Sequence, residues 1–175
     1  MNEAIDLRDY IRDVPDFPLP GILFRDITPL LQAPAAFEAA LVALCDYVAD
    51  RGPDAIVGIE SRGFIFGTPI AARLGLPFVP VRKPGKLPAA HMSVEYALEY
   101  GSGQLDIHSD ALQRGQRVVI VDDLLATGGT AVGACKLAEL IQGKVAGIAF
   151  LIELEGLRGR ERLEGYDVFS LLKYT

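Results

Sequence analysis

A glycine-containing turn with hydroxyl groups on both sides follows one strongly apolar segment of the chain. The turn reads ATGGT at positions 126–130 and comes directly after VVIVDDLL. Because glycine has no side chain, backbone N–H groups in such a turn can converge on one ligand, and the helix that follows adds the partial positive charge of its N-terminus. This chemistry suits a phosphate monoester. The predicted phosphate-binding residues are Ala126, Thr127, Gly128, Gly129 and Thr130.

Two adjacent carboxylates, Asp122 and Asp123, lie just upstream of this turn. Ionised carboxylates accept hydrogen bonds from both hydroxyl groups of a ribose diol, and they also bind Mg²⁺ directly or through water. For an isolated pair, one turn-capping aspartate beside a solvated one is the alternative. The nearby phosphate loop favours the functional interpretation, so the combination predicts a site for a ribose 5-phosphate. The chain has no GxxxxGK[ST] motif and no GxGxxG motif, which argues against a nucleoside triphosphate loop or a dinucleotide fingerprint.

Positive charge is concentrated in two other loops. Ser61 and Arg62 follow the apolar segment AIVGIE, and a guanidinium group beside backbone donors is a suitable partner for pyrophosphate. Arg82, Lys83 and Lys86 follow a second apolar segment, LPFVPV. An ordinary solvated loop is the alternative for both groups, and Lys86 fits that alternative equally well. Ribose 5-phosphate together with pyrophosphate points to phosphoribosyl pyrophosphate (PRPP).

Apolar segments that alternate with amphipathic ones predict how these loops are positioned. The segment 35–50, for example, places Phe37, Leu41, Leu44 and Val48 at helical spacing. Helices are predicted at 35–50, 64–75 and 130–141, and strands at 55–60, 76–83, 117–123, 144–154 and 167–172. This alternation implies right-handed crossovers and a parallel sheet with helices on both faces. Because ligands bind beyond the carboxyl ends of such strands, the three loops are expected at one edge of the sheet.

Composition limits the class of protein. The chain has 175 residues, of which 50% are apolar and 23% charged, and this profile predicts a single globular domain at 1–175. A net charge of −6 disfavours nucleic acid and membrane surfaces as partners. The apolar stretches are short and the N-terminus lacks a basic, apolar leader, so a cytoplasmic protein is expected. Cys45 and Cys135 are expected to be buried packing thiols, and the RGRER run at 158–162 a solvated helix face.

The segment VVIVDDLLATGGT resembles the PRPP-binding motif of type I phosphoribosyltransferases. Further segments resemble the adenine phosphoribosyltransferases within that family, and together they span nearly the whole chain. They are DFPLPGILFRDITPLL (16–31), GIESRGFIFG (58–67), VRKPGKLP (81–88), EYALEYG (95–101) and VFSLLKY (168–174). The resemblance implies the type I phosphoribosyltransferase fold, an α/β fold with a twisted parallel sheet flanked by helices. It also implies a small N-terminal base-binding hood at 1–34 and a flexible lid loop or hairpin at 83–103.

The reaction that the resemblance implies is a step of purine salvage. The 5-phosphoribosyl group of PRPP would pass to N9 of adenine, giving AMP and pyrophosphate through an oxocarbenium-like transition state. The implied cofactor is Mg²⁺, held mainly through PRPP, with a water-mediated contact to Asp122 or Asp123. The implied small-molecule substrates are therefore adenine and PRPP, and the implied assembly is a homodimer.

The resemblance also implies roles for residues whose types alone do not suggest a site. Phe24 would stack on adenine, while the Leu23 carbonyl and the Arg25 amide would read the edge of the base that carries its amino group. Glu99 would be the catalytic residue, on the imidazole side of adenine. Without the resemblance, Phe24 fits a core residue and Glu99 a surface residue. The implied pyrophosphate ligands are Ser61, Arg62, Arg82, Lys83 and Lys86, with the loop cations partly across a dimer interface and a cis peptide between Glu60 and Ser61.

Three other functions fit parts of this pattern. A phosphoribosyltransferase for hypoxanthine or xanthine would share the PRPP site, although it is expected to present a donor such as lysine to the 6-oxo group. A non-catalytic PRPP-sensing regulator would usually carry an added DNA-binding segment or a basic face. The hypothesis of an unrelated sugar-phosphate-binding protein would explain residues 122–130, but it would give no function to Glu60–Gly63 or to the lid.

Overall fold

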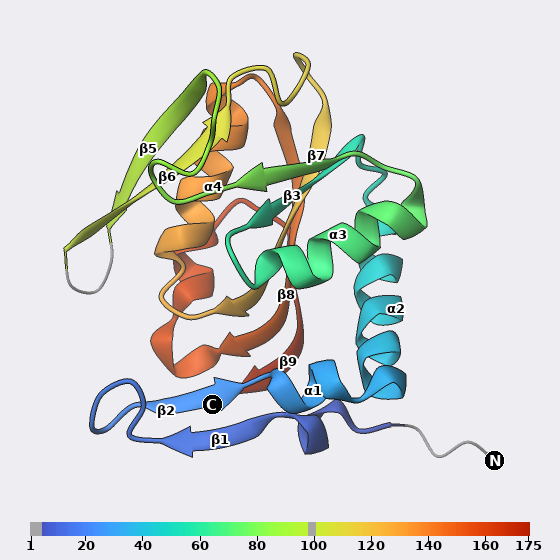
Figure 1. Cartoon of the computed structure of the whole chain (residues 1–175), viewed down its shortest axis with the longest axis vertical. Helices are drawn as coiled ribbons and strands as arrows, with labels where there is room; N and C mark the ends of the chain where they lie inside the picture. Colours follow the sequence, from blue (N-terminus) through green and yellow to red (C-terminus); the bar gives the residue numbers. More distant parts are fainter. Residues whose placement is uncertain (1–4, 98–100) are drawn as a thin grey trace. The chain divides into compact units, whose positions relative to one another are not determined.

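The computed structural model describes residues 5–97 and 101–175 of the chain (Figure 1). The chain divides into two compact units, Met1–Ala43 and Leu44–Thr175. The first unit contains η1 (Leu7–Tyr10), β1 (Arg12–Pro15), β2 (Leu23–Asp26), α1 (Thr28–Gln32) and the first part of α2 (Pro34–Asp50).

The two strands of the first unit form an antiparallel ribbon. Arg12 lies opposite Asp26 in this ribbon, and Pro15 lies opposite Leu23. Between the strands, the chain turns through Gly21, which has a φ of +86° and donates its N–H to the Asp16 carboxylate at 2.7 Å. A φ of this size is strained for most residues that carry a side chain, so glycine suits this position.

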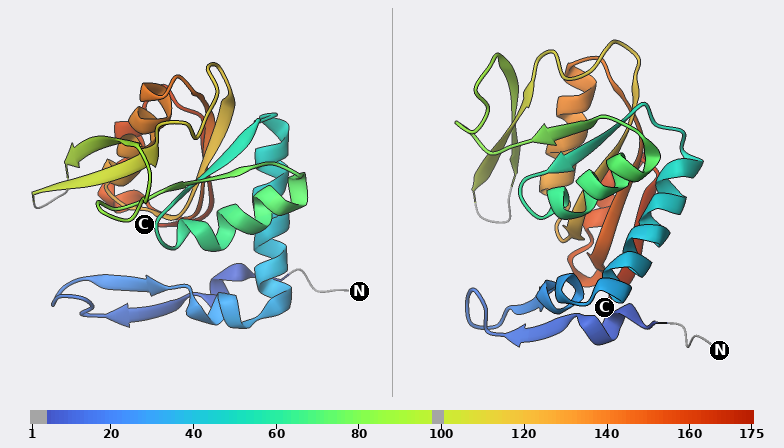
Figure 2. Two further views of the ribbon diagram at one scale, coloured as in Figure 1. Left: turned by 45° about the horizontal axis from the view of Figure 1, so that its top comes forward. Right: turned by 45° about the vertical axis from the view of Figure 1, so that its right-hand side comes forward.

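The second unit is built on a five-stranded sheet in which every neighbouring pair is parallel (Figures 1 and 2). In spatial order its strands are β4 (Phe78–Val81), β3 (Ala55–Ile59), β7 (Arg117–Leu125), β8 (Lys144–Leu154) and β9 (Val168–Tyr174). Each predicted strand is present. The predicted strand at 76–83 is shorter than expected, and the one at 117–123 continues to Leu125.

Helices cover both faces of this sheet, as predicted. Helix α3 (Gly63–Leu74) packs against β3 and β7, and α4 (Gly129–Leu140) packs against β7 and β8. Residues 118–121 of β7 are all fully buried, and two of them, Val118 and Ile120, join the apolar core that includes α4. Because side chains alternate along a strand, the other two face the opposite side. A strand covered on both faces has to be apolar throughout, which explains the unbroken VVIV run.

The two strands of a β-hairpin overlap the second part of the region predicted as a lid loop or hairpin at 83–103. Strand β5 (His91–Ala97) pairs antiparallel with β6 (Ser102–His108), which agrees with the expected hairpin character. Leu105 and Ile107 of β6 are buried in the core shared with α4. One face of β6 therefore packs the hairpin onto the apolar core of the second unit.

The buried thiols are confirmed. The solvated helix face predicted at 158–162 is confirmed only in part, because Arg158, Glu161 and Arg162 are exposed, whereas Gly159 is buried and Arg160 is half-buried. Cys45 and Cys135 are both buried and unpaired, and burial raises the pKa of the Cys135 thiol to about 12. The RGRER run forms a 3₁₀ turn, η3 (Gly159–Leu163), after a shorter one, η2 (Glu155–Leu157). The turn is held to the sheet by an ion pair that the charge pattern alone did not indicate.

This ion pair joins Arg160 to Glu153 at the end of β8. The guanidinium donates to both carboxylate oxygens, at 2.9 and 2.5 Å, and to the carbonyl oxygen of Val168 at 2.7 Å. The Glu153 side chain is 5% exposed and that of Arg160 is 39% exposed. The hydrogen bonds from Arg160 hold the pKa of Glu153 below its usual value, despite the opposing effect of burial.

We expect Arg160→Met to lower the free energy of unfolding by about 2 kcal/mol at pH 7. Loss of one partner of a fully buried pair costs roughly 3–5 kcal/mol, and the exposure of Arg160 reduces that figure. A lowered pKa stabilises the fold above the ordinary carboxyl pKa of about 4.3, and the effect is lost as the pH falls through the folded value. Urea denaturation at pH 7 and at pH 4 should therefore show a smaller difference in acid. A difference that grows in acid would contradict this role.

Candidate functional site

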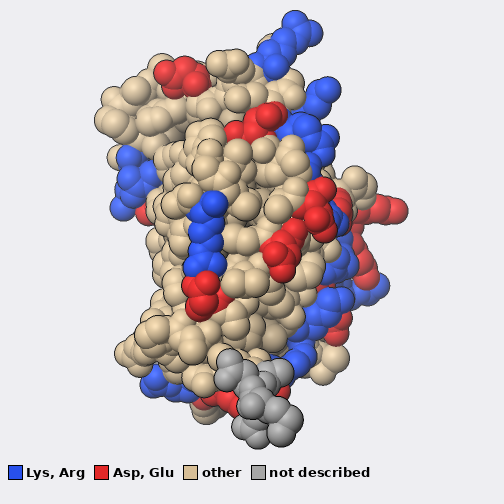
Figure 3. Space-filling model, turned by 90° about the vertical axis from the view of Figure 1, so that its right-hand side faces the viewer, with Lys and Arg blue, Asp and Glu red and all other residues tan. Residues whose placement is uncertain are grey.

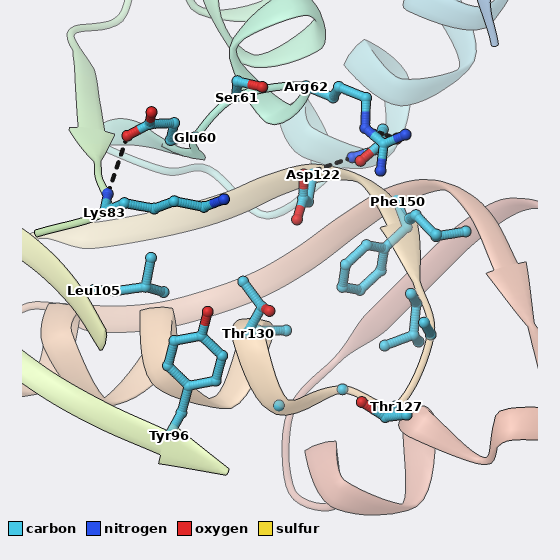
Figure 4. Close-up of a pocket in the computed structure, with 17 residues that line it drawn as sticks. Glu60, Ser61, Arg62, Lys83, Tyr96, Leu105, Asp122, Thr127, Thr130 and Phe150 are labelled. Carbon is cyan, nitrogen blue, oxygen red and sulfur yellow. Dashed lines mark hydrogen bonds and ion pairs between the residues drawn. The ribbon is translucent and has the colours of Figure 1, made fainter. Parts of the chain in front are cut away.

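A cavity of about 430 Å³ opens beyond the carboxyl ends of β3 and β7 (Figure 4). All three loops predicted from the sequence contribute to it, which is the expected consequence of parallel strands that end at one edge of the sheet. The predicted site residues that it brings together are Ser61, Arg62, Lys83, Asp122, Asp123, Ala126, Thr127, Gly128, Gly129 and Thr130.

The predicted phosphate loop ends at the N-terminus of α4. Gly128 is the N-cap residue, and its φ of +81° lies in the left-handed region. A Cβ atom added at Gly128 would approach the carbonyl oxygen of Gly159 at 2.5 Å, so η3 packs directly behind the loop. The first N–H groups of an α-helix have no acceptor within the helix. Gly129, Thr130 and Ala131 all line the cavity, so this end of α4 supplies anion-binding donors.

The two adjacent aspartates occupy different environments in the cavity wall. Asp123 is buried, with a side chain that is 6% exposed, and its Oδ2 lies 2.9 Å from Nε of Arg62. Asp122 accepts a hydrogen bond from the Asp123 backbone N–H at 2.9 Å. Burial raises the pKa of Asp122, and the neighbouring Asp123 charge raises it further. Burial also raises the pKa of Asp123, against the opposing effect of Arg62. A ligand that donates hydroxyl groups or brings a cation would favour the ionised form of this pair.

The cationic residues predicted to bind pyrophosphate are divided between the cavity and its edge. Lys83 lines the cavity, and its side chain extends into it in Figure 4. Arg82 and Lys86 do not belong to the cavity lining. Instead, the Arg82 guanidinium and the Lys86 ammonium lie 3.2 and 3.8 Å from the Glu60 carboxylate. The peptide between Glu60 and Ser61 is cis, as the resemblance implied.

Sequence reasoning missed several residues of the cavity wall. Tyr96 lines the cavity from β5, and in Figure 4 its hydroxyl group points into it. The ring packs over α4, where a Cβ atom at Gly133 would lie 3.1 Å from Tyr96. Leu105 and Phe150 form apolar parts of the wall. The only sequence signal for Tyr96 is its place in the EYALEYG segment, because the pairing of Tyr96 with a helix glycine depends on tertiary structure.

A second unpredicted contact links η3 to the hairpin. Nη1 of Arg162 lies 3.5 Å from the carbonyl oxygens of Ala97 and Thr127. One guanidinium group therefore bridges the end of β5 and the phosphate loop. Arg162 belongs to the RGRER run, which was predicted to face solvent.

The residues predicted to bind adenine belong to the first unit. Leu23, Phe24 and Arg25 form the start of β2, and the ring of Phe24 contacts that of Phe17 edge-to-face at 5.2 Å between centroids. Arg25 forms an ion pair with Asp13 on the neighbouring strand. The role of this segment in binding a base remains a prediction. Glu99, the predicted catalytic residue, lies outside the described residues.

A parallel α/β sheet with a glycine-containing turn at the start of α4 and two carboxylates beside it is the arrangement expected of a phosphoribosyltransferase. The family described as "Phosphoribosyl transferase domain" matches residues 27–173 of the chain. The fold is the type I phosphoribosyltransferase fold, as predicted.

Comparison with individual proteins narrows this class. The adenine phosphoribosyltransferase of Halothermothrix orenii is 54% identical over 169 residues, which are 97% of this chain and 99% of that protein. A crystal structure of adenine phosphoribosyltransferase from Thermoanaerobacter pseudethanolicus is 54% identical with a TM-score of 0.94, covering 96% of this chain and 98% of that one. The Saccharomyces cerevisiae enzyme, at 40% identity and a TM-score of 0.88, covers 95% of this chain and 96% of that one. The chain belongs to the adenine phosphoribosyltransferase family.

Proposed function

We propose that the protein transfers the 5-phosphoribosyl group of PRPP to N9 of adenine, giving AMP and pyrophosphate in purine salvage. The observation that carries this proposal is the cavity that unites the phosphate loop, the aspartate pair and Arg62 with Lys83. The related structure from Saccharomyces cerevisiae was solved with adenine and an imino-altritol bisphosphate, an arrangement of base and sugar phosphates that suits these substrates.

The ribose 5-phosphate end of PRPP would bind between the phosphate loop and the aspartate pair. Residues 126–130 would hold the 5-phosphate through backbone N–H groups and the two threonine hydroxyls. Asp122 and Asp123 would accept hydrogen bonds from the ribose hydroxyls. Their raised pKa values support this role, because hydroxyl donors would relieve the cost of keeping both groups ionised in a buried position.

The pyrophosphate end would lie near the loop after β3. Ser61 would offer backbone donors, while Arg62 and Lys83 would contact phosphate oxygens from the cavity wall. A guanidinium group has several N–H donors, so Arg62 can keep its contact with Asp123 and still bind pyrophosphate. Arg82 and Lys86 would add positive charge from the edge of the cavity. These cations would stabilise the negative charge that develops on the leaving group.

Adenine would bind through the first unit. Phe24 would stack on the base, while the Leu23 carbonyl and the Arg25 amide would recognise its amino edge and ring nitrogen. Holding the base on the face of C1 opposite to pyrophosphate favours inversion at that carbon. Glu99, hydrogen-bonded at N7, would stabilise the reacting tautomer of adenine or take part in the transfer of its N9 proton. The 1–34 hood and the 83–103 lid would exclude water from the cationic sugar.

Magnesium would serve this reaction through the substrate more than through the protein. No group of three or more metal-binding side chains occurs among residues 5–97 and 101–175. Asp122 and Asp123 provide two carboxylates beside the proposed ribose site, which fits an ion held mainly by PRPP oxygens with a water-mediated contact to one of them. When bound, Mg²⁺ would neutralise charge on the pyrophosphate oxygens.

We also propose that the protein is a homodimer and that it is located in the cytoplasm. Sedimentation velocity would test the oligomeric state.

No helix in the described ranges is long and apolar enough to cross a membrane. On the face drawn in Figure 3, acidic and basic side chains are interspersed and a broad area carries neither. An interspersed pattern of this kind does not favour a nucleic-acid partner on that face.

Asp123→Asn tests the proposed PRPP site. We expect PRPP to bind about 10- to 100-fold more weakly in the presence of Mg²⁺, because a hydrogen bond to a charged group contributes about 1.5–3 kcal/mol. Isothermal calorimetry would measure the affinity, and Asp110→Asn on an exposed turn provides the matched control. Equal PRPP affinity in the Asp123 variant and the wild type would contradict the assignment.

A further inference from the structure

Glu60 is a nearly buried carboxylate that the proposed reaction does not use. It directly follows β3, lines the cavity, and has a side chain that is 12% exposed. Its backbone N–H donates to the Val81 carbonyl at 2.9 Å, which fixes it against the end of β4. A buried carboxylate at this position requires compensating donors.

In the described part of the chain, the groups that compensate Glu60 come from one short segment, residues 82–86. Oε2 accepts hydrogen bonds from the Lys83 backbone N–H at 3.0 Å and from Nε of Arg82 at 3.2 Å. Oε1 lies 3.8 Å from the Lys86 ammonium. One carboxylate therefore contacts all three cationic residues of the loop: the side chains of Arg82 and Lys86, and the backbone N–H of Lys83, which Figure 4 shows.

The segment is also held on its other side. The backbone of Arg82 forms two hydrogen bonds with Asp106 of β6, at 2.9 and 2.7 Å. Nη1 of Arg82 donates to the Lys86 carbonyl at 3.2 Å. With Arg82 fixed between β6 and Glu60, the Lys83 backbone has a defined position, and its side chain extends into the cavity.

The charge of Glu60 is maintained in this environment. Burial acts to raise its pKa, but the Lys83 N–H and the Arg82 and Lys86 cations together outweigh burial, so the pKa lies below the usual value. Glu60 is therefore ionised at neutral pH. It can hold two cations close to each other that would otherwise repel.

We propose that Glu60 is a positioning residue for the diphosphate end of the substrate: it holds residues 82–86 so that Lys83 extends toward the pyrophosphate and Arg82 and Lys86 stay at the cavity edge, without further ordering. This inference rests on the proposed function. Without Glu60, the loop and its long side chains would become ordered only when pyrophosphate binds, and the ordering cost would weaken that step by about 10-fold or more. The ribose 5-phosphate end, which is held by the loop at 126–130, would be unaffected.

The test compares two ligands that use different ends of the cavity. Calorimetry would measure the binding of inorganic pyrophosphate with Mg²⁺, and separately of AMP, to the wild type, Glu60→Ala and Glu60→Gln. We expect Glu60→Ala to bind pyrophosphate about 10-fold or more weakly and AMP with unchanged affinity. Glu60→Gln keeps one acceptor for the Lys83 N–H, so its loss should be smaller. Glu60→Gln also allows the affinities for the two ligands to be compared if Glu60→Ala is unstable.

The control is Asp167→Ala. The Asp167 carboxylate lies 2.6 Å from the Arg51 guanidinium, and neither residue lines the cavity. This control should change neither affinity. Tighter pyrophosphate binding by the Glu60 variants would mean that the carboxylate competes with the ligand, and it would overturn the inference. Equal losses for both ligands, or no loss, would also overturn it. A wild type that binds no pyrophosphate would instead refute the proposed function, and the inference with it.

Discussion

Gly128→Ala is expected to lower kcat/KM for PRPP by about 100-fold. The left-handed φ of +81° at this position is strained for alanine, and the added Cβ would approach the Gly159 carbonyl oxygen at 2.5 Å. The backbone fixes the position of the Cβ atom and the carbonyl oxygen belongs to the backbone, so no side-chain rotation can relieve the contact and the phosphate loop has to shift. A displacement of about 1 Å in a substrate-positioning group can lower the rate by about 100-fold. Steady-state kinetics with varied PRPP would measure the effect.

Gly156→Ala is the matched control for this substitution. Gly156 lies in η2, close to Gly159 in sequence, and a Cβ atom there would meet nothing within 4 Å. We expect this variant to keep wild-type kinetics. If Gly128→Ala also kept wild-type kcat/KM while remaining folded, the loop could not bind the 5-phosphate as proposed.

Glu99→Gln is expected to lower kcat by about 100- to 10,000-fold, which is the range for a placed acid–base group. The amide keeps the size of the side chain but removes its negative charge and its ability to accept a proton. Because Glu99 is assigned to the base and not to PRPP, the KM for PRPP should change little. Steady-state kinetics with each substrate varied in turn would separate the two parameters.

Glu95→Gln, at an exposed position on β5, provides the matched control for Glu99 and should leave kcat unchanged. An equal loss in kcat and in PRPP affinity would count against a catalytic role for Glu99. It would indicate that the substitution disturbs the substrate site in general.

The sheet and the phosphate loop could be predicted from the sequence because their signals are local. The VVIV run of β7 is apolar at every position, as a strand covered on both faces requires. The two glycines and two threonines that follow it indicate an anion site by their types alone. The parallel topology then predicts that the loops after β3 and β7 meet, and in the cavity they do.

The remaining parts of the site depend on contacts between segments far apart in the sequence. Glu60 could not be distinguished from a solvated loop residue until the structure placed the 82–86 segment around its carboxylate. The RGRER run reads as a solvated face by charge, yet Arg160 pairs with buried Glu153 and Arg162 reaches the phosphate loop. Such pairings depend on which strand ends lie together, and spacing along one segment does not contain that information.

The identity of the purine base that accepts the phosphoribosyl group is tested most directly by a product assay. Purified protein with PRPP and Mg²⁺ would be incubated separately with adenine, hypoxanthine, guanine and xanthine, and nucleotide formation followed by chromatography. We predict AMP from adenine and no nucleotide from the other three bases. IMP, GMP or XMP as the main product would contradict the assignment of Leu23, Phe24 and Arg25 to the amino edge of adenine. PRPP binding without any nucleotide product would contradict catalysis itself and favour a PRPP-sensing regulator.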